Sequence, residues 1–194
     1  LYQKGRVLSL TVPRGKGRNL ARLAGMDGIH FPVTQDRIES RLTIATSEPL
    51  DILAAHGVVV RRVGMNHPGG SFGFRVEHAG KTFVFIPDNE IEPPYARTIA
   101  PEALVAYCRG ADLMVHDAQY VADDFPMKRG WGHSLWTDTA DLARAAKVGR
   151  LALYHHDPER TDDELDAIAE QMRGHLAGSE VESSVAAEGT TIEL

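Results

Sequence analysis

Hydrophobic and polar residues follow two different periods along the chain, and the change of period predicts the order of strands and helices. Short apolar runs bounded by glycine, proline or polar residues are typical of buried strands, whereas apolar residues three or four positions apart are typical of helices on a core. Strands are expected at residues 7–12, 41–45, 58–63, 72–77, 82–86, 113–115 and 151–154, with one or two more between 181 and 194. Helices are expected at residues 19–25, 101–110, 136–146 and about 161–176, and residues 47–49 are either a turn or the start of one helical turn through residues 53–55. From residue 72 onward, this alternation predicts an α/β fold.

Local signals indicate where several of these elements begin and end. The sequence His78-Ala79-Gly80-Lys81 between two apolar strands predicts a hairpin turn. Thr161-Asp162-Asp163-Glu164 is a capping-box pattern at the start of the last helix. Ser134 or Thr137 could cap the helix before it. Residues 118–132 are expected to form a long connection, because they are rich in charge and glycine.

The composition is that of an ordinary globular protein. The 194 residues are 43% hydrophobic and 25% charged, which favours a single domain over residues 1–194. A net charge of −6 argues against bulk nucleic-acid binding, although it leaves room for a local basic cleft. The single cysteine, Cys108, excludes an internal disulfide and favours a reducing, cytoplasmic location, and we expect it in the core. No apolar run of about 20 residues is present, so no membrane partner is expected.

Residues that can bind metal recur where predicted strands end. Asp88 follows one strand, His116-Asp117 a second and His155-His156-Asp157 a third, while His67 precedes a strand and His133 opens a helix. Imidazole nitrogen and carboxylate oxygen are ligands that zinc and similar ions use. Taken singly, each of these histidines is more typical of a structural residue. Their recurrence at equivalent positions predicts a metal or acid–base site.

A basic loop near the start of the chain is a candidate phosphate site. Arg14, Lys16 and Arg18 lie in a glycine-containing turn that could hold a phosphate of the substrate. The turn lacks the Gly-Lys-Ser/Thr sequence that ends a P-loop, and a solvated loop is the alternative interpretation.

Five segments, in this order, resemble the metallo-β-lactamase fold, and within it the branch of ribonuclease Z and the cyclic-phosphate phosphodiesterases. The segment from Leu113 to Tyr120 resembles the one that ribonuclease Z relatives write as HEAT, and the segment from Gly130 to Ser134 resembles their GHS/T segment. They cover roughly residues 58–170, and the resemblance implies an αββα sandwich of the α/β (α+β) class. The segments are Asn66-His67-Pro68 through Phe74, Phe85-Ile86-Pro87-Asp88, Leu113 through Tyr120, Gly130-Trp131-Gly132-His133-Ser134 and Leu153-Tyr154-His155-His156-Asp157-Pro158.

The resemblance also implies roles for individual residues and a pair of divalent ions, with zinc favoured over manganese or iron. His67 would bind the first ion, Asp88 would bridge both, and His155, rather than His156, would bind the second. His133 would protonate the leaving oxygen. His116 and Asp117 would orient His133 or shape the pocket, since a carboxylate beside a histidine fixes its tautomer.

The motif that defines the family, HxHxDH, occurs nowhere in the 194 residues. We therefore expect a domain that is incomplete at its N-terminal side, lacking the first strands and the first metal loop. Truncation is favoured over a natural variant, because the later site residues are all present. A chain without these ligands is expected to be inactive or impaired.

The predicted function of the intact parent is hydrolysis of a phosphodiester by a hydroxide bound to two metal ions. The substrate would be a small phosphodiester, with RNA as an open alternative. A thioester, ester or lactam hydrolase of the same fold is the second hypothesis, because fold does not decide chemistry. The third is a non-catalytic interaction module that forms a homodimer through an exposed sheet edge.

Overall fold

The structure, a computed structural model, describes residues 4–11, 39–45 and 53–194. The chain divides into two compact units, residues 1–58 and residues 59–194. In the first unit, β1 (Val7–Thr11) pairs in parallel with β2 (Arg41–Ala45), so two predicted strands are confirmed. The basic loop with Arg14, Lys16 and Arg18 and the predicted helix at residues 19–25 lie outside the described residues.

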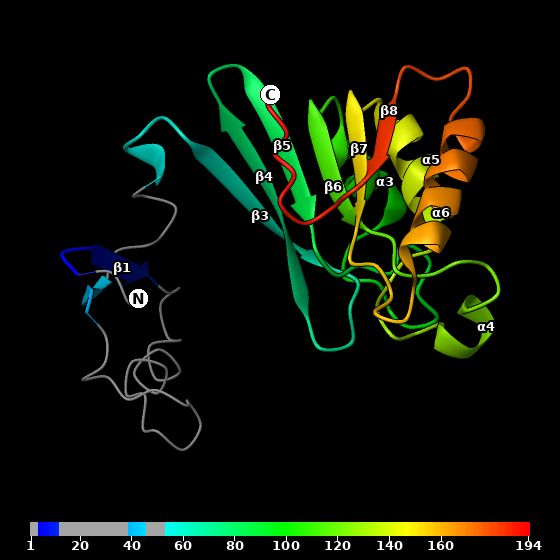
Figure 1. Ribbon diagram of the computed structural model, residues 1–194, viewed down its shortest axis with the longest axis horizontal. Coiled ribbons are helices and arrows are strands. Elements are labelled where there is room, and N and C mark those ends of the chain that lie inside the picture. The colour runs from blue at the N-terminus through cyan, green and yellow to red at the C-terminus, as the bar shows by residue number, and fades with distance from the viewer. Residues whose placement is uncertain (1–3, 12–38, 46–52) are drawn as a thin grey trace. The chain divides into compact units, whose positions relative to one another are not determined.

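The second unit is built on a six-stranded sheet whose strands lie side by side in chain order. The first two pairs of neighbouring strands are antiparallel, whereas the last four strands run parallel to one another (Figure 1). Every predicted strand of this unit is present, and residues 181–194 contain one described strand. The strands are β3 (Val59–Met65), β4 (Ser71–His78), β5 (Lys81–Ile86), β6 (Leu113–Asp117), β7 (Arg150–Tyr154) and β8 (Glu182–Val185).

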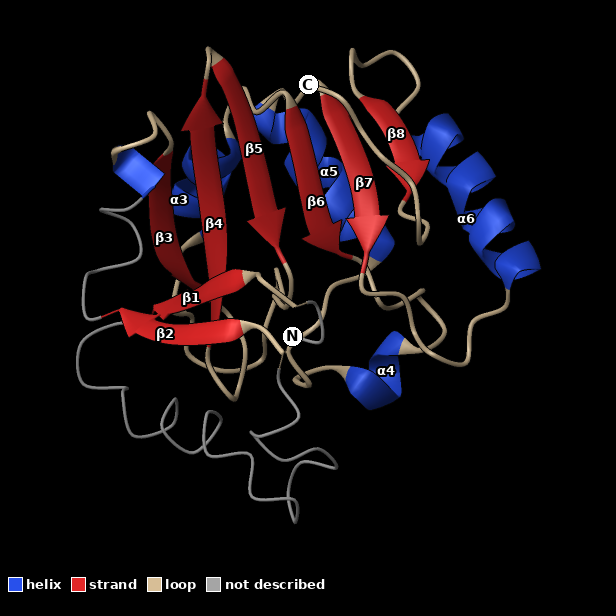
Figure 2. Cartoon of the chain, turned by 60° about the vertical axis from the view of Figure 1, so that its left-hand side comes forward, coloured by secondary structure: helices blue, strands red, loops and turns tan. Residues whose placement is uncertain are grey.

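Three of the four described helices correspond to predicted ones. They are α3 (Pro101–Cys108), α5 (Trp136–Ala146) and α6 (Asp162–His175). In Figure 2, α3 and α5 lie behind the central strands, and α6 runs beside β8. Among the described residues, no helix combines the length and apolar composition that crossing a membrane requires.

One short helix was not predicted, and one predicted helix cap was wrong. The connection at residues 118–132 contains a one-turn helix, α4 (Phe125–Lys128), where a proline in the first turn matches the helical backbone. The start of α5 has no side-chain cap, because Leu135 occupies the capping position. Ser134 instead donates its hydroxyl hydrogen to the carbonyl of Asn89 and accepts the N–H of Ile91.

Other local predictions are confirmed. Thr161 and Glu164 form both hydrogen bonds of the capping box at the start of α6. Strands β4 and β5 form the expected hairpin, and its two turn residues, Ala79 and Gly80, both have positive φ angles of 50° and 76°. That pair of angles suits a tight hairpin between twisted strands.

The hydrophobic core lies between the sheet and its helices. Val84, Met114 and Leu151, on neighbouring strands, are at most 1% exposed. Cys108 is fully buried in this core, as predicted, and burial raises the pKa of its thiol to about 12. Because β5, β6 and β7 are parallel, their carboxyl ends meet at one edge of the sheet, where the predicted site residues follow them.

Candidate metal and acid–base site

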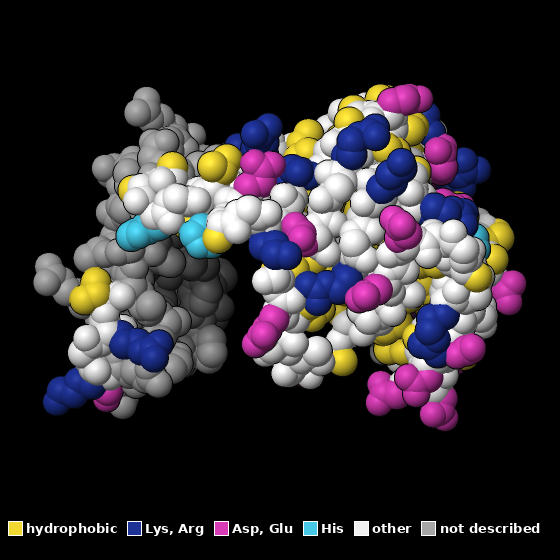
Figure 3. Space-filling view, turned by 90° about the horizontal axis from the view of Figure 1, so that it is seen from above, with side chains coloured by type: hydrophobic (Ala, Val, Ile, Leu, Met, Phe, Trp, Pro, Cys, Tyr) yellow, Lys and Arg dark blue, Asp and Glu magenta, His cyan; other side chains and the backbone are white. Residues whose placement is uncertain are grey.

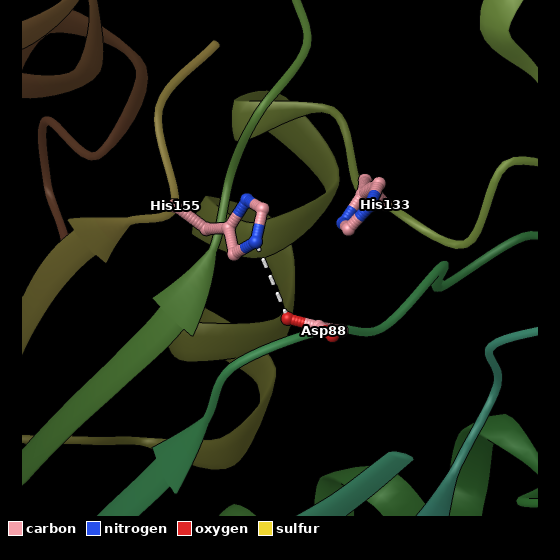
Figure 4. A group of neighbouring side chains, drawn as sticks. All are labelled: Asp88, His133 and His155. Carbon is pink, nitrogen blue, oxygen red and sulfur yellow. Dashed lines mark ion pairs between the residues drawn. The ribbon is translucent and has the colours of Figure 1, made fainter. Parts of the chain in front are cut away.

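Three side chains from separate segments converge at the carboxyl ends of the parallel strands. Asp88 follows β5, His155 follows β7, and His133 lies in the loop before α5 (Figure 4). Each offers one ligand atom, and the three atoms lie within 4.8 Å of one another. The distance from His155 Nε2 to Asp88 Oδ1 is 3.4 Å. A carboxylate oxygen and two imidazole nitrogens at this spacing fit a divalent cation.

The backbone of His155 is in a conformation that few residues other than glycine adopt. Its φ angle is 59°, in the left-handed region, at the point where the strand ends. The ring stacks on His133 with 4.7 Å between centroids. Nδ1 of His155 is buried and has no hydrogen-bond partner among the described residues. Apart from its contact with Asp88, the ring is therefore not engaged by a described hydrogen bond, which suits a metal ligand.

His133 is held by a buried carboxylate. Its Nδ1 lies 2.6 Å from Oδ2 of Asp117, which is fully buried. Burial lowers the pKa of His133, but the hydrogen bond and charge of Asp117, with the charges of Asp88 and Glu90, outweigh it and raise the pKa above its ordinary value. The pairing places a proton on Nδ1 and leaves Nε2 for proton transfer or for a metal.

Asp117 and His116 are buried side chains at the end of β6 that support His133. Asp117 also accepts the backbone N–H groups of Asn89 and Gln119, each at 3.1 Å. His116 is fully buried, and its Nδ1 lies 2.6 Å from the carbonyl of Asp117. Burial lowers the pKa of His116 despite that contact, which favours a neutral ring. The structure thus places His116 behind Asp117, where it positions the strand end.

His67 lies beside His133 but outside the group of three possible ligands. The two rings meet edge to face with 5.5 Å between centroids. Nδ1 of His67 accepts the backbone N–H of Gly69 at 3.1 Å. A Cβ atom at Gly132 would lie 2.2 Å from Cδ2 of His67, so the loop before His133 can approach this closely only with glycine there. Of the three predicted ligands, Asp88 and His155 lie close together. His67 contacts the ring of His133, which is itself close to both.

His156 is directed away from the group that contains His155. Its Nε2 lies 3.3 Å from the carbonyl of Ala186, beyond β8, and burial lowers its pKa. Asp157 binds Nζ of Lys128 at 2.6 Å, and this hydrogen bond lowers the pKa of the Asp157 carboxyl.

The sequence prediction missed a buried polar network that supports these residues. Asn66 accepts two backbone N–H groups through its Oδ1 and donates its own N–H to Asn89 Oδ1. Glu90, which is 0% exposed, accepts the N–H groups of Gly130 and Gly132 at 2.8 and 3.0 Å. The available signal was position: these polar residues lie within two positions of the predicted ligands His67 and Asp88.

The chain matches a known protein family over most of its length. Residues 2–156 match the family described as "Beta-lactamase superfamily domain". Curated proteins named ribonuclease Z match it in part. The one from Bradyrhizobium sp. (strain ORS 278) is 29% identical over 86% of this chain and 42% of its own length. The one from Thermoplasma acidophilum is 39% identical over 31% of this chain and 20% of its own length. The matched regions thus span less than half of these relatives.

Solved structures show the same fold at low sequence identity. The short form of human tRNase Z has a TM-score of 0.59 and 19% identity, over 97% of this chain and 67% of its own. Zn²⁺-bound PqqB from Methylobacterium extorquens has a TM-score of 0.58 and 18% identity, over 98% and 66% of the two chains. The metallo-β-lactamase fold protein YhfI from Bacillus subtilis has a TM-score of 0.60 and 15% identity, over 95% and 64%. The predicted family is confirmed: the chain belongs to the β-lactamase superfamily and has the metallo-β-lactamase fold.

Proposed function

We propose that this chain carries one part of the active site of a metal-dependent phosphodiester hydrolase, with His133 as the proton donor. The observation that carries the proposal is the pairing of His133 with buried Asp117 beside Asp88 and His155. The name of the curated relatives, ribonuclease Z, supports a phosphodiester over a thioester, ester or lactam. The natural substrate would be a small phosphodiester or RNA.

Asp88 and His155 would hold a divalent ion, zinc before manganese or iron, and His67 would take part in a second, adjacent site. Such an ion would offset the charge of the phosphodiester and activate water. The 194 residues contain no HxHxDH motif, and the described residues bring only one carboxylate and two imidazoles together. We therefore propose weak metal binding and impaired activity for this chain.

His133 would supply the proton that the leaving oxygen needs. Its raised pKa favours the imidazolium form more than an ordinary histidine does, with Nδ1–H held by Asp117. As the bond between phosphorus and the leaving oxygen breaks, Nε2 would pass its proton to that oxygen. The ring would then be neutral, with its remaining proton still on Nδ1 facing Asp117. His116 would keep Asp117 in place through the end of β6.

Zinc titration calorimetry on single variants tests these separate roles. His155→Gln and Asp88→Asn should weaken zinc binding about tenfold or more, because each removes a ligand. His133→Gln should leave zinc affinity within about threefold, because the proposal makes it a proton donor. The control is His56→Gln, at an exposed histidine. A loss of affinity in His133→Gln equal to that in His155→Gln would make His133 a ligand and overturn its assignment as the acid.

A further inference from the structure

Trp131 is a large apolar side chain held at the surface next to the candidate proton donor. It is 61% exposed, and it lies two residues before His133 between two glycines with positive φ angles of 91° and 101°. Single exposed apolar residues are common and by themselves indicate nothing. Two further features set Trp131 apart: the rigidity of its loop and the cavity that it lines.

The loop is anchored on both sides of the tryptophan. The two carboxylate oxygens of buried Glu90 accept the N–H groups of Gly130 and Gly132. The N–H of Trp131 itself bonds to the carbonyl of Lys128 at 3.2 Å. The close approach of Gly132 to His67 adds a fourth constraint. A rigidly presented indole loses little conformational entropy when it binds a ligand.

Trp131 and His133 line the same cavity, whose volume is about 440 Å³. That volume lies within the roughly 300–1,000 Å³ typical of small-molecule sites. The amide oxygen of Gln119, another lining residue, is buried without a hydrogen-bond partner among the described residues, which leaves one polar acceptor beside the cavity unsatisfied. The described lining residues are Gln119, Tyr120, Lys128, Trp131, His133, Asp157, Pro158 and Glu159.

The charged side chains of the cavity do not concentrate positive charge, since Lys128 and the proposed imidazolium of His133 are matched by Asp157 and Glu159, and this balance suits a neutral group. The one lysine, Lys128, is already paired with Asp157, and its Nζ lies 5.3 Å from the centroid of the Tyr120 ring. Glu159 adds a further negative charge to the lining. More widely, Figure 3 shows basic and acidic side chains interspersed over the visible face of the described residues. A phosphate is better placed on the side of His133 that faces Asp88 and His155 (Figure 4).

We propose that this cavity binds a planar ring that the substrate carries next to the hydrolysed phosphodiester, with Trp131 as the stacking platform. The proposal rests on the proposed function for the position of the phosphodiester. Trp131 is then a residue that determines specificity, because a stacked ring strengthens binding about tenfold or more, whatever its hydrogen-bonding pattern. The ring is either a nucleobase or a simple aryl group, and both present the same flat apolar face.

Binding of three phosphates to the full chain tests the proposal. Adenosine 5′-monophosphate, phenyl phosphate and ribose 5-phosphate share a phosphate but differ in their ring. We expect adenosine monophosphate to bind about tenfold or more tighter than ribose 5-phosphate by calorimetry, and to quench the indole fluorescence. Phenyl phosphate binding as tightly as the nucleotide identifies an aryl site, whereas weaker binding identifies a nucleobase site; either supports a ring subsite. Equal affinities for all three would overturn it.

Variants assign the preference to the indole. Trp131→Leu should abolish the difference between adenosine monophosphate and ribose 5-phosphate, whereas Trp131→Phe should keep most of it. Met127→Leu, at a side chain that is 87% exposed, is the matched surface control. A preference that survives in Trp131→Leu would refute the stacking role.

The zinc and ring experiments separate the two proposals. If zinc binding depends on Asp88 and His155 but the protein shows no preference for a ring, the ring subsite is refuted and the proposed function stands. If the ring preference exists but zinc binding is indifferent to both residues, the proposed function fails instead.

Discussion

At the scale of single residues, one buried carboxylate governs the geometry of the loop that carries His133. Glu90 is fully buried and holds both glycines that flank Trp131. A buried charge is retained only where hydrogen bonds compensate its lost hydration. The Glu90 carboxylate therefore links the end of β5 to the loop before α5, and it keeps two proposed functional side chains at fixed positions.

Replacing Glu90 should destabilise the protein more than replacing a nearby surface glutamate. Glu90→Gln puts an amide NH₂ where an oxygen accepts an N–H, so one donor loses its partner, at a cost of about 1–3 kcal/mol. Glu92→Gln is the control, since the side chain of Glu92 is 52% exposed and pairs with Arg97. Its effect should stay within about 0.5 kcal/mol. Urea unfolding measures both, and equal losses would show that the Glu90 contacts contribute little.

At the scale of elements, the crossover from β5 through α3 to β6 decides which site residues become neighbours. The parallel register pairs Ile86 with His116, so that Asp88 and Asp117 follow at the same sheet edge. Asp112 fixes the other end of this register. Its carboxylate accepts the N–H of Thr82 at 2.8 Å, while its own N–H bonds to the carbonyl of Thr82 at 2.9 Å.

The contribution of Asp112 to stability should depend on pH. The hydrogen bond from Thr82, followed by that from Lys81, lowers the pKa of the Asp112 carboxyl below its ordinary value of 3.8. The folded state therefore binds a proton less readily than the unfolded state. The resulting stabilisation is present above pH 3.8 and is lost as the pH falls through the folded-state pKa.

Asp112→Asn should consequently cost about 0.5–1.5 kcal/mol at pH 7, with the cost shrinking below pH 4. Denaturant unfolding at pH 7, 4 and 3 measures the change. Asp123→Asn, at an exposed aspartate, should show no such trend. A cost for Asp112→Asn that stays constant with pH would mean that the charge of Asp112 does not take part.

At the scale of the whole molecule, every described residue of the candidate site belongs to the second compact unit, residues 59–194. The described hydrophobic core lies in that unit as well. The single domain over residues 1–194 and the homodimer stay predictions, and light scattering of the full chain would test the homodimer. The phosphate site at Arg14, Lys16 and Arg18 also stays a prediction, outside the described residues.

Hydrolysis by the chain should be at or near background. With zinc or manganese added, turnover of bis(p-nitrophenyl) phosphate should stay within about threefold of the metal-only rate, because a two-metal site needs more ligands than the described residues assemble. A thioester assayed in parallel should give the same result. Turnover that disappears in His155→Ala would show a working site and overturn the proposed impairment.

The sequence by itself determined the strands and the three longer helices of the second unit, and their order. The apolar period, the hairpin turn at Ala79-Gly80 and the capping box at Thr161 all depend on residues close together in the chain, which is why local patterns predicted them. The burial of Cys108 followed from its place on an apolar helix stripe. The family could also be predicted, because its segments occur in order.

Only the tertiary structure decided which polar residues meet. Strand register and loop anchoring placed His133, and not His67, within ligand distance of Asp88 and His155. The same contacts turned Ser134 from a predicted helix cap into a partner of Asn89. They also buried Glu90, which looks like a turn residue in the sequence. Each of these outcomes depends on hydrogen bonds between residues at least 16 positions apart in the chain, and no local pattern encodes such partners.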